Sequence, residues 1–140
     1  MAAQAKANQM FVNLPVKDLN RSIEFFTKVG FEFNAQFTDE TATCMVIGDN
    51  LYAMLLVEEK FKSFTNKAIP DASANASSLV ALSVNSREEA DSIADRALDA
   101  GGKPTNDPAD YGFMYTRSFQ DLDGHHWEVF HMDPSAVQGQ

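Results

Sequence analysis

Residues 10–33 read MFVNLPVKDLNRSIEFFTKVGFEF, and this stretch predicts a strand, a helix and the start of a second strand in immediate succession. The apolar run 10–16 is typical of a strand. Asp18 then supplies a helix N-cap, and apolar residues recur every three or four positions until Gly30 provides the C-terminal stop. Apolar and polar residues alternate over 31–37, which is the period of a half-buried strand.

Two further strands complete a βαβββ unit. They are predicted over 41–47 and 51–57 and are joined by a short hairpin-type connection. The next residues, 58–78, have mixed polarity and many small side chains. This composition favours a linker with a short helix around Phe61 and Phe64.

The same pattern then begins again. A strand over 79–84 precedes a helix whose start carries a capping-box signature, Ser86 with Glu89 three residues on. Strands over 112–119 and 125–132 follow, and we expect them to form a hairpin.

An offset of 68 residues aligns the two halves of the chain. The offset superposes Val12 on Val80, Leu14 on Leu82, Val16 on Val84 and the helix cap Asp18 on Ser86. This register predicts an internal duplication of a βαβββ unit. Because one such unit is too small to bury a core of its own, we expect the two halves to pack together.

Length and composition indicate one globular domain. The chain has 140 residues and a mass of 15.5 kDa, which suits a single core. The domain is predicted over 10–133, with a first module at about 10–57 and a second at about 79–133. Residues 1–9 are expected to be a flexible N-terminus and residues 134–140 a tail.

The charge balance limits the partners. Eleven Lys and Arg against twenty Asp and Glu give a net charge of −9, and no basic patch interrupts this field, so neither nucleic acid nor an anionic membrane is an expected partner. No apolar run approaches the roughly 18 residues of a membrane span, and the start lacks a secretory signal, so we expect a cytoplasmic protein. The single cysteine, Cys44, lies in an apolar run and predicts a buried thiol.

Two motifs carry a family resemblance, VKDLNRSIEFFTKVGFEF at 16–33 and SFQDLDGHHWEVF at 118–130. Through them the chain resembles, over residues 10–133, the vicinal oxygen chelate superfamily of glyoxalases, bleomycin-resistance proteins and extradiol dioxygenases. More closely, it looks like a bacterial subgroup of predicted lactoylglutathione lyases. The resemblance implies an α+β fold in which two βαβββ modules form a curved, cup-shaped mixed sheet.

The resemblance also implies where a metal would be held. Active members hold a divalent cation in the cup, with ligands from the first and last strands of each module, where it stabilises an enediolate or similar anion. Those positions fall on Phe11, Leu79, Met54 or Leu55, and Glu128. One carboxylate alone does not hold a divalent ion, so we expect no metal and no other cofactor.

Glu128 is the candidate catalytic residue. It stands where the resemblance places the last metal ligand, and on the strand period it shares a face with His126, opposite Trp127 and Val129. It is predicted to act as a general base or a polar anchor for a ligand. The alternative is a structural carboxylate bonded to an Arg or Tyr, and the sequence leaves both open.

The other candidates are expected to contact a ligand. Asn13, on the first strand, offers an amide to a ligand oxygen, or else bonds to a neighbouring loop. Several aromatic residues line an apolar cavity or belong to the core. Arg117 is placed to meet Glu128 or a ligand's carboxylate, or else forms a surface ion pair. The full set of ligand-binding candidates is Phe11, Asn13, Met54, Phe61, Phe64, Leu79, Tyr115, Arg117 and His126.

Three functions remain open. The first is a glyoxalase-like protein that binds a small, partly apolar molecule in the cup without a metal, as a binding protein or a metal-free enzyme. The second is a metal-dependent lactoylglutathione lyase-like lyase or a dioxygenase, with His126 and Glu128 at the core of a ligand set unlike that of the family. The third is an interaction module. We expect a homodimer, since relatives of this length commonly pair and the chain has apolar surface to spare.

Overall fold

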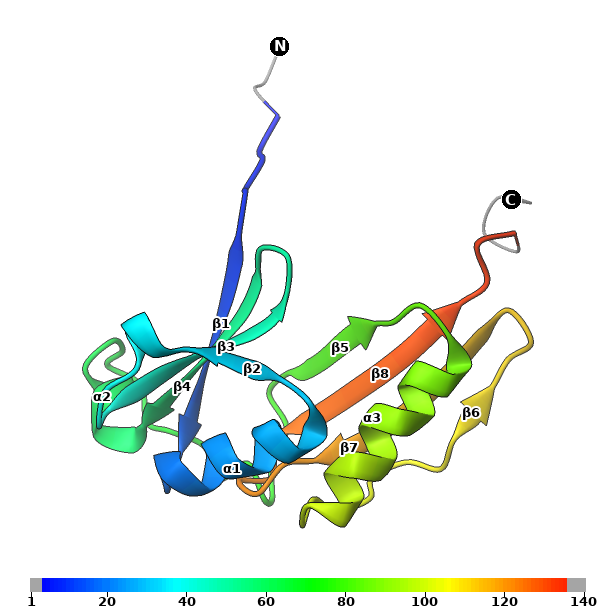
Figure 1. The fold of residues 1–140 in the computed structure, drawn as a ribbon. Helices are drawn as coiled ribbons and strands as arrows, with labels where there is room; N and C mark the ends of the chain where they lie inside the picture. Colours follow the sequence, from blue (N-terminus) through cyan, green and yellow to red (C-terminus); the bar gives the residue numbers. More distant parts are fainter. Residues whose placement is uncertain (1–3, 136–140) are drawn as a thin grey trace. The chain divides into compact units, whose positions relative to one another are not determined.

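The same order of elements occurs twice in the chain (Figure 1). The computed structural model describes residues 4–135. The first repeat comprises β1 (Met10–Val16), α1 (Leu19–Val29), β2 (Glu32–Asn34), the 3₁₀ turn η1 (Ala35–Phe37), β3 (Ala42–Gly48) and β4 (Leu51–Val57). A short helix, α2 (Glu58–Lys62), follows it. The second repeat comprises β5 (Leu79–Ser83), α3 (Arg87–Asp99), β6 (Ala109–Asp110), β7 (Met114–Gln120) and β8 (His126–Met132).

Each repeat forms a four-stranded mixed sheet with an equivalent strand order. The orders are β1-β4-β3-β2 and β5-β8-β7-β6. In each sheet the first strand pairs in parallel with the last, and the remaining pairs are antiparallel. The predicted α+β fold with two βαβββ modules is therefore confirmed.

The two long helices begin at the predicted caps. The Asp18 carboxylate accepts a hydrogen bond from the backbone N–H of Arg21 (3.1 Å), and the Ser86 hydroxyl accepts one from the backbone N–H of Glu89 (3.1 Å). Gly30 follows the last residue of α1 with a φ of 119°, a conformation that residues with a Cβ rarely adopt. These contacts satisfy backbone groups that a helix end leaves without partners.

Most strand bounds lie within two residues of the predicted ones, and two strands differ more from the prediction. The strand expected over 31–37 is shorter, because the Asn34 side chain accepts a hydrogen bond from the backbone N–H of Gln36 (3.0 Å) and closes a 3₁₀ turn. The two-residue strand β6 was not predicted. It exists through the pairing of Ala109 with Thr116 and of the next residue with Tyr115.

The chain forms two compact units. The first unit contains the residues up to Ile23 and Phe31–Ile69, and the second contains Glu24–Gly30 and the residues from Pro70 onward. The division passes through α1. The last turns of this helix therefore belong to the same unit as the second sheet.

The second sheet has one face covered by helix, which we call its helix face, and an opposite open face. Helix α3 lies along the helix face and contacts β7 and β8 (Figure 1). Val129 forms a buried cluster there with Ala90 and Ala94 of α3, and Leu82 packs against it. Side chains alternate along a strand, so Glu128 lies on the open face.

Aromatic rings fill the rest of the helix face. Trp127 and Phe119 are buried and stack at 6.4 Å between ring centroids. Phe26 of α1 meets the Trp127 ring edge to face at 5.3 Å, and Phe25 lies 6.4 Å from Phe119. Buried aromatic side chains of this size are a major part of a small core's stability.

The first sheet has the same two-sided character. Leu14 and Val16 of β1 are buried, as is Leu55 of β4, whereas Phe11 and Asn13 are exposed. Phe11 and Asn13 therefore lie on the open face of this sheet. Among residues 4–135, no helix is both long and apolar enough to cross a lipid bilayer.

Candidate functional site

A hollow of about 460 Å³ lies in the first unit, lined by Asn13, Phe61, Phe64 and Thr65. Helix α2 begins directly after β4 ends, and it contacts both β1 and β4. This sharp connection brings Phe61, near the end of α2, and Phe64, just beyond it, to Asn13 on β1. The hollow thus brings together three residues that the sequence predicts as ligand contacts.

The open face beside the hollow is apolar. Phe11 stacks on Tyr52 with 4.7 Å between ring centroids and 14° between the ring planes. Met54 is the register partner of Asn13 across the parallel β1–β4 pair, and neighbours in register point to the same side of a sheet. The structure therefore places all five predicted ligand residues of the first unit, Phe11, Asn13, Met54, Phe61 and Phe64, on or over one sheet face.

None of the described residues that line the hollow carries a charge. Within residues 4–135 the side-chain amide of Asn13 makes no hydrogen bond. The Thr65 hydroxyl accepts a hydrogen bond from the backbone N–H of Lys67 (3.2 Å) and keeps its own proton to donate. The site thus offers neutral hydrogen-bonding groups between aromatic walls.

Glu128 lies on the open face of the second sheet. Its register partners are Ala81 and Ser118, and Leu79 stands opposite His126. The Glu128 carboxylate and the Nε2 of His126 are 3.3 Å apart, and the two side chains are 29% and 16% exposed. The partner of Glu128 is therefore neither an Arg nor a Tyr, as the structural alternative required, but the histidine two residues before it.

Arg117 and Tyr115 lie on the other face of this sheet. Arg117 stands opposite Val129, not Glu128, and its guanidinium donates to Asp91 (2.7 Å) and Asp95 (2.9 Å) of α3. The Tyr115 hydroxyl donates to Asp91 (2.6 Å), and this bond, with Arg117, holds the pKa of the Asp91 carboxyl below its usual value. The structure thus forms an ion-pair cluster and does not bring Arg117 to Glu128.

The positions that the resemblance gives to metal ligands do not have suitable donors. Met54 stands on the open face and Leu55 on the buried one, so Met54 is the residue at the equivalent position. Together with Phe11 and Leu79 it leaves Glu128 as the single oxygen donor of the four, and hard divalent cations need several. No three His, Cys, Asp or Glu side chains within residues 4–135 are grouped to hold a metal ion. The donor set does not fit the family's metal.

Asp121 is a residue whose importance the sequence does not reveal. It is 4% exposed, and its carboxylate accepts hydrogen bonds from the Trp127 indole and from the backbone N–H groups of Asp123 and His125, each at 3.0 Å. Burial raises the pKa of this carboxyl. The bonds fix the turn before β8 and the indole on the helix face, so that Glu128 points to the open face. The Asp-X-Asp-Gly sequence predicts the turn but not the buried carboxylate.

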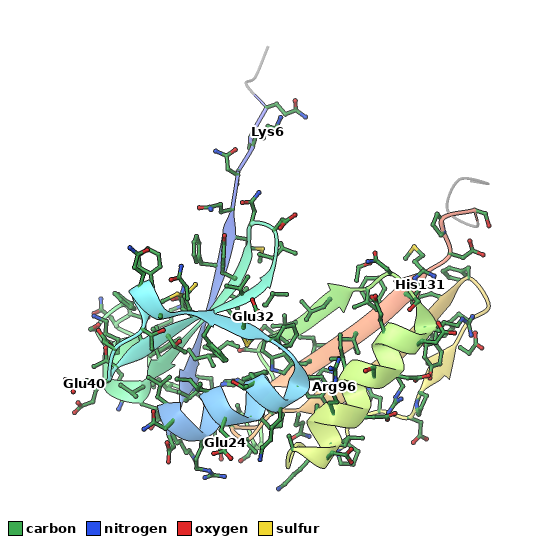
Figure 2. All side chains as sticks on the ribbon, viewed as in Figure 1. Lys6, Glu24, Glu32, Glu40, Arg96 and His131 are labelled. Carbon is green, nitrogen blue, oxygen red and sulfur yellow. The ribbon has the colours of Figure 1, made fainter. Side chains whose placement is uncertain are left out.

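A second hollow, of about 270 Å³, lies in the second unit between the start of α3 and the end of β8. Arg87, Phe113, His131 and Asp133 are among its lining residues, and Figure 2 shows His131 at this end of β8. The Arg87 guanidinium is already engaged, because it donates two hydrogen bonds to Asp110 (2.7 and 3.0 Å). None of these residues was predicted as a ligand contact.

Solved structures with the same fold are known from several bacteria. The hypothetical protein SA1046 from S. aureus is 26% identical and has a TM-score of 0.76, with 91% of this chain and 96% of that chain covered. A glyoxalase/bleomycin resistance protein/dioxygenase family enzyme from Burkholderia phytofirmans PsJN is 15% identical, with a TM-score of 0.73 and coverage of 90% and 99%. The fosfomycin resistance protein FosX from Listeria monocytogenes is 19% identical, with a TM-score of 0.66 and coverage of 91% and 92%.

The amino-acid sequence gives the family directly. No curated protein matches the chain. The sequence model of the Glyoxalase/Bleomycin resistance protein/Dioxygenase superfamily matches residues 9–129, which include the first repeat, the second repeat as far as the middle of β8, and the candidate residues on both open faces. The chain belongs to the glyoxalase/bleomycin resistance protein/dioxygenase superfamily.

Proposed function

We propose that this protein binds a small, partly apolar molecule in the hollow on the open face of its first sheet, without the metal of its family. The observation that carries the proposal is the grouping of Asn13, Phe61 and Phe64 around a hollow of about 460 Å³. Ligand sites are commonly concave, mostly apolar and supplied with a few polar groups. This hollow has each of those properties.

A neutral fluorophore tests the proposal. N-phenyl-1-naphthylamine emits more strongly in apolar surroundings, and we expect its titration to saturate. Phe64→Ala should weaken binding about fivefold, the loss expected for one aromatic contact of about 1 kcal/mol. Phe37→Ala is the matched control, because Phe37 is also exposed (63%, against 65% for Phe64) but does not line the hollow. No saturable binding, or an equal loss in both variants, would contradict the proposal.

The metal-free part of the proposal has its own support. Phe11, Met54 and Leu79 supply no oxygen or nitrogen at three of the four positions that the family resemblance gives to ligands. We expect elemental analysis after mild dialysis to find far less than one Ni, Zn, Fe or Mn per chain. A stoichiometric metal would contradict this part.

The second candidate is a metal-dependent lyase of the lactoylglutathione lyase type, or a dioxygenase, with donors unlike those of the family. The proximity of His126 and Glu128, 3.3 Å apart on an open sheet face, favours it. Under this candidate a stoichiometric metal would be present and His126→Ala would remove it. Ligand binding to the first unit with no metal in the protein would favour the first candidate instead.

A further inference from the structure

We propose that the hollow of the first unit recognises a flat, uncharged ring that carries a secondary amide within the ring, and that Asn13 is the residue that selects it. This inference rests on the proposed function and adds to it the chemical class of the ligand. Such compounds are lactams. Their N–H and C=O lie side by side on one edge of the ring.

The walls of the hollow favour a flat molecule. Phe61 and Phe64 supply two phenyl rings, and on the adjoining sheet face Phe11 and Tyr52 are stacked, with 14° between their planes. Aromatic faces gain most from a planar partner in offset stacking or edge contact. An aliphatic chain in the same place would bury area but not use these faces.

The charges near the hollow favour a neutral molecule. Its lining, as far as the described part of the chain supplies it, has no ionisable residue. The Lys60 ammonium lies 5.3 Å from the centroid of the Phe64 ring, so a cationic ligand would meet a like charge there. An anionic ligand would approach a chain with a net charge of −9, and among the lining residues that the structure describes it would find no cation. A neutral ring avoids both costs.

The Asn13 amide specifies the polar edge of the ring. An asparagine side chain holds one acceptor and two donor hydrogens in a single plane, and this one has no partner within residues 4–135. A lactam edge supplies one donor and one acceptor at the matching spacing, so that two parallel hydrogen bonds form. A ketone or an ether would use only the donor side and leave the Asn13 oxygen without a partner, which lowers affinity.

Two ring compounds of nearly equal shape test the inference. Oxindole has the lactam N–H, and N-methyloxindole lacks it. Ligand-observed NMR titration of the full chain should give oxindole a dissociation constant about tenfold lower than that of N-methyloxindole, as expected for a two-bond amide contact. In Asn13→Leu the two compounds should bind equally. In Asn13→Asp, which has no donor, both compounds lose the hydrogen bond to their C=O and should bind more weakly, but the carboxylate still accepts from the oxindole N–H, so the preference for oxindole should remain.

The outcomes distinguish a failure of the lactam inference from a failure of the proposed function on which it rests. Equal binding of the two compounds to the natural protein, while N-phenyl-1-naphthylamine still binds, would overturn the lactam inference and leave the proposed function standing. Failure of all three probes would overturn the proposed function. Asn13 is exposed on an edge strand, so both variants should melt within a few degrees of the natural protein. Phe37→Ala should keep the tenfold preference.

Discussion

Within residues 4–135 Glu128 has a single polar partner, the imidazole of His126, and both lie on the open face of the second sheet. A carboxylate that held the fold together would be buried and either hydrogen-bonded to several donors, as Asp121 is, or paired with a cation. Glu128 keeps 29% of its side-chain surface exposed. Arg117, the cation that the sequence predicts as a partner for Glu128, instead pairs with Asp91 and Asp95 on the opposite face of the sheet. These contacts favour a role of Glu128 in binding a ligand over a role in stabilising the fold.

The Glu128→Gln variant tests that role. We expect its unfolding free energy to change by less than about 1 kcal/mol, because no buried cation loses its partner. If Glu128 acts on a ligand, native mass spectrometry should show less of any small molecule that the natural protein retains through purification. A large fall in melting temperature with the molecule still retained would show that Glu128 stabilises the fold and does not contribute to binding that molecule.

Asp121 should behave in the opposite way. It is buried, and its carboxylate accepts hydrogen bonds from Trp127, Asp123 and His125. Asp121→Ala leaves one indole and two backbone N–H groups without an acceptor, at a cost of about 3 kcal/mol or more. Urea denaturation followed by Trp127 fluorescence measures this loss. A change below about 1 kcal/mol would show that water or a neighbouring group replaces the carboxylate.

The sequence predicts the sheet face of Glu128 correctly but does not predict that Arg117 lies on the other face, and the difference has a physical reason. The face of Glu128 follows from the alternation of its own strand, which is local, and the structure places it as expected. The face of Arg117 relative to Glu128 depends on the register of the β7–β8 hairpin, and the five-residue turn between the strands does not specify that register. In the structure Ser118, not Arg117, stands opposite Glu128.

Helix α3 is attached to β7 by a cluster of polar side chains as well as by its apolar face. Asp91 accepts from Tyr115 and from Arg117, and Asp95 accepts from Arg117. The Tyr115 hydrogen bond is the largest influence that lowers the pKa of Asp91, and Arg117 adds to it. Because the folded-state pKa lies below the unfolded one, the charged carboxylate stabilises the fold above its unfolded pKa, and this contribution is lost as the pH falls through the folded pKa.

The difference in stability between the Asp91→Asn variant and the natural protein should therefore depend on pH. We expect the variant to be less stable than the natural protein by about 1 kcal/mol at neutral pH, since Tyr115 and Arg117 lose a charged acceptor. The difference should shrink as the pH falls below about 4. Melting temperatures measured between pH 2.5 and 7 would show the two curves converging. Asp95→Asn is the control, because its more exposed carboxylate pairs, within residues 4–135, with Arg117 alone and should matter less.

Elements with strong local signals are the ones that the sequence predicts well. The strand β1, the helix α1 and the strand β4 have the predicted bounds, since each has its own periodicity and its own stop. The strand β6 has two residues and is defined only by its pairing with β7, so no local pattern indicates it. The hollow, like β6, has no local pattern in the sequence that indicates it. Its aromatic residues are visible in the sequence, but their position over Asn13 depends on the packing of α2 against β1 and β4.

At the scale of the whole chain, charge and exposed apolar surface act against each other in self-association. Met10 and Leu51 are register partners at the start of the paired strands β1 and β4, so they point to the same side of the sheet, and each is at least 48% exposed. We call these two residues the β1 patch. Burial of such side chains favours association by about 1.5 to 3 kcal/mol each, whereas the net charge of −9 per chain opposes it. Because exposed charges are screened by salt and apolar contacts are not, association through the β1 patch should strengthen as the salt concentration rises.

We therefore predict a homodimer that forms through the β1 patch. Light scattering at micromolar concentration and 0.15 M salt should give twice the 15.5 kDa mass of one chain. Leu51→Lys should raise the dissociation constant at least tenfold, because it removes an apolar contact and adds a group that must stay hydrated. Phe37→Lys changes an aromatic residue of similar exposure outside the patch and should leave the dimer intact. A mass near 15.5 kDa at every salt concentration would refute the dimer, and equal effects of the two lysine variants would place its interface elsewhere.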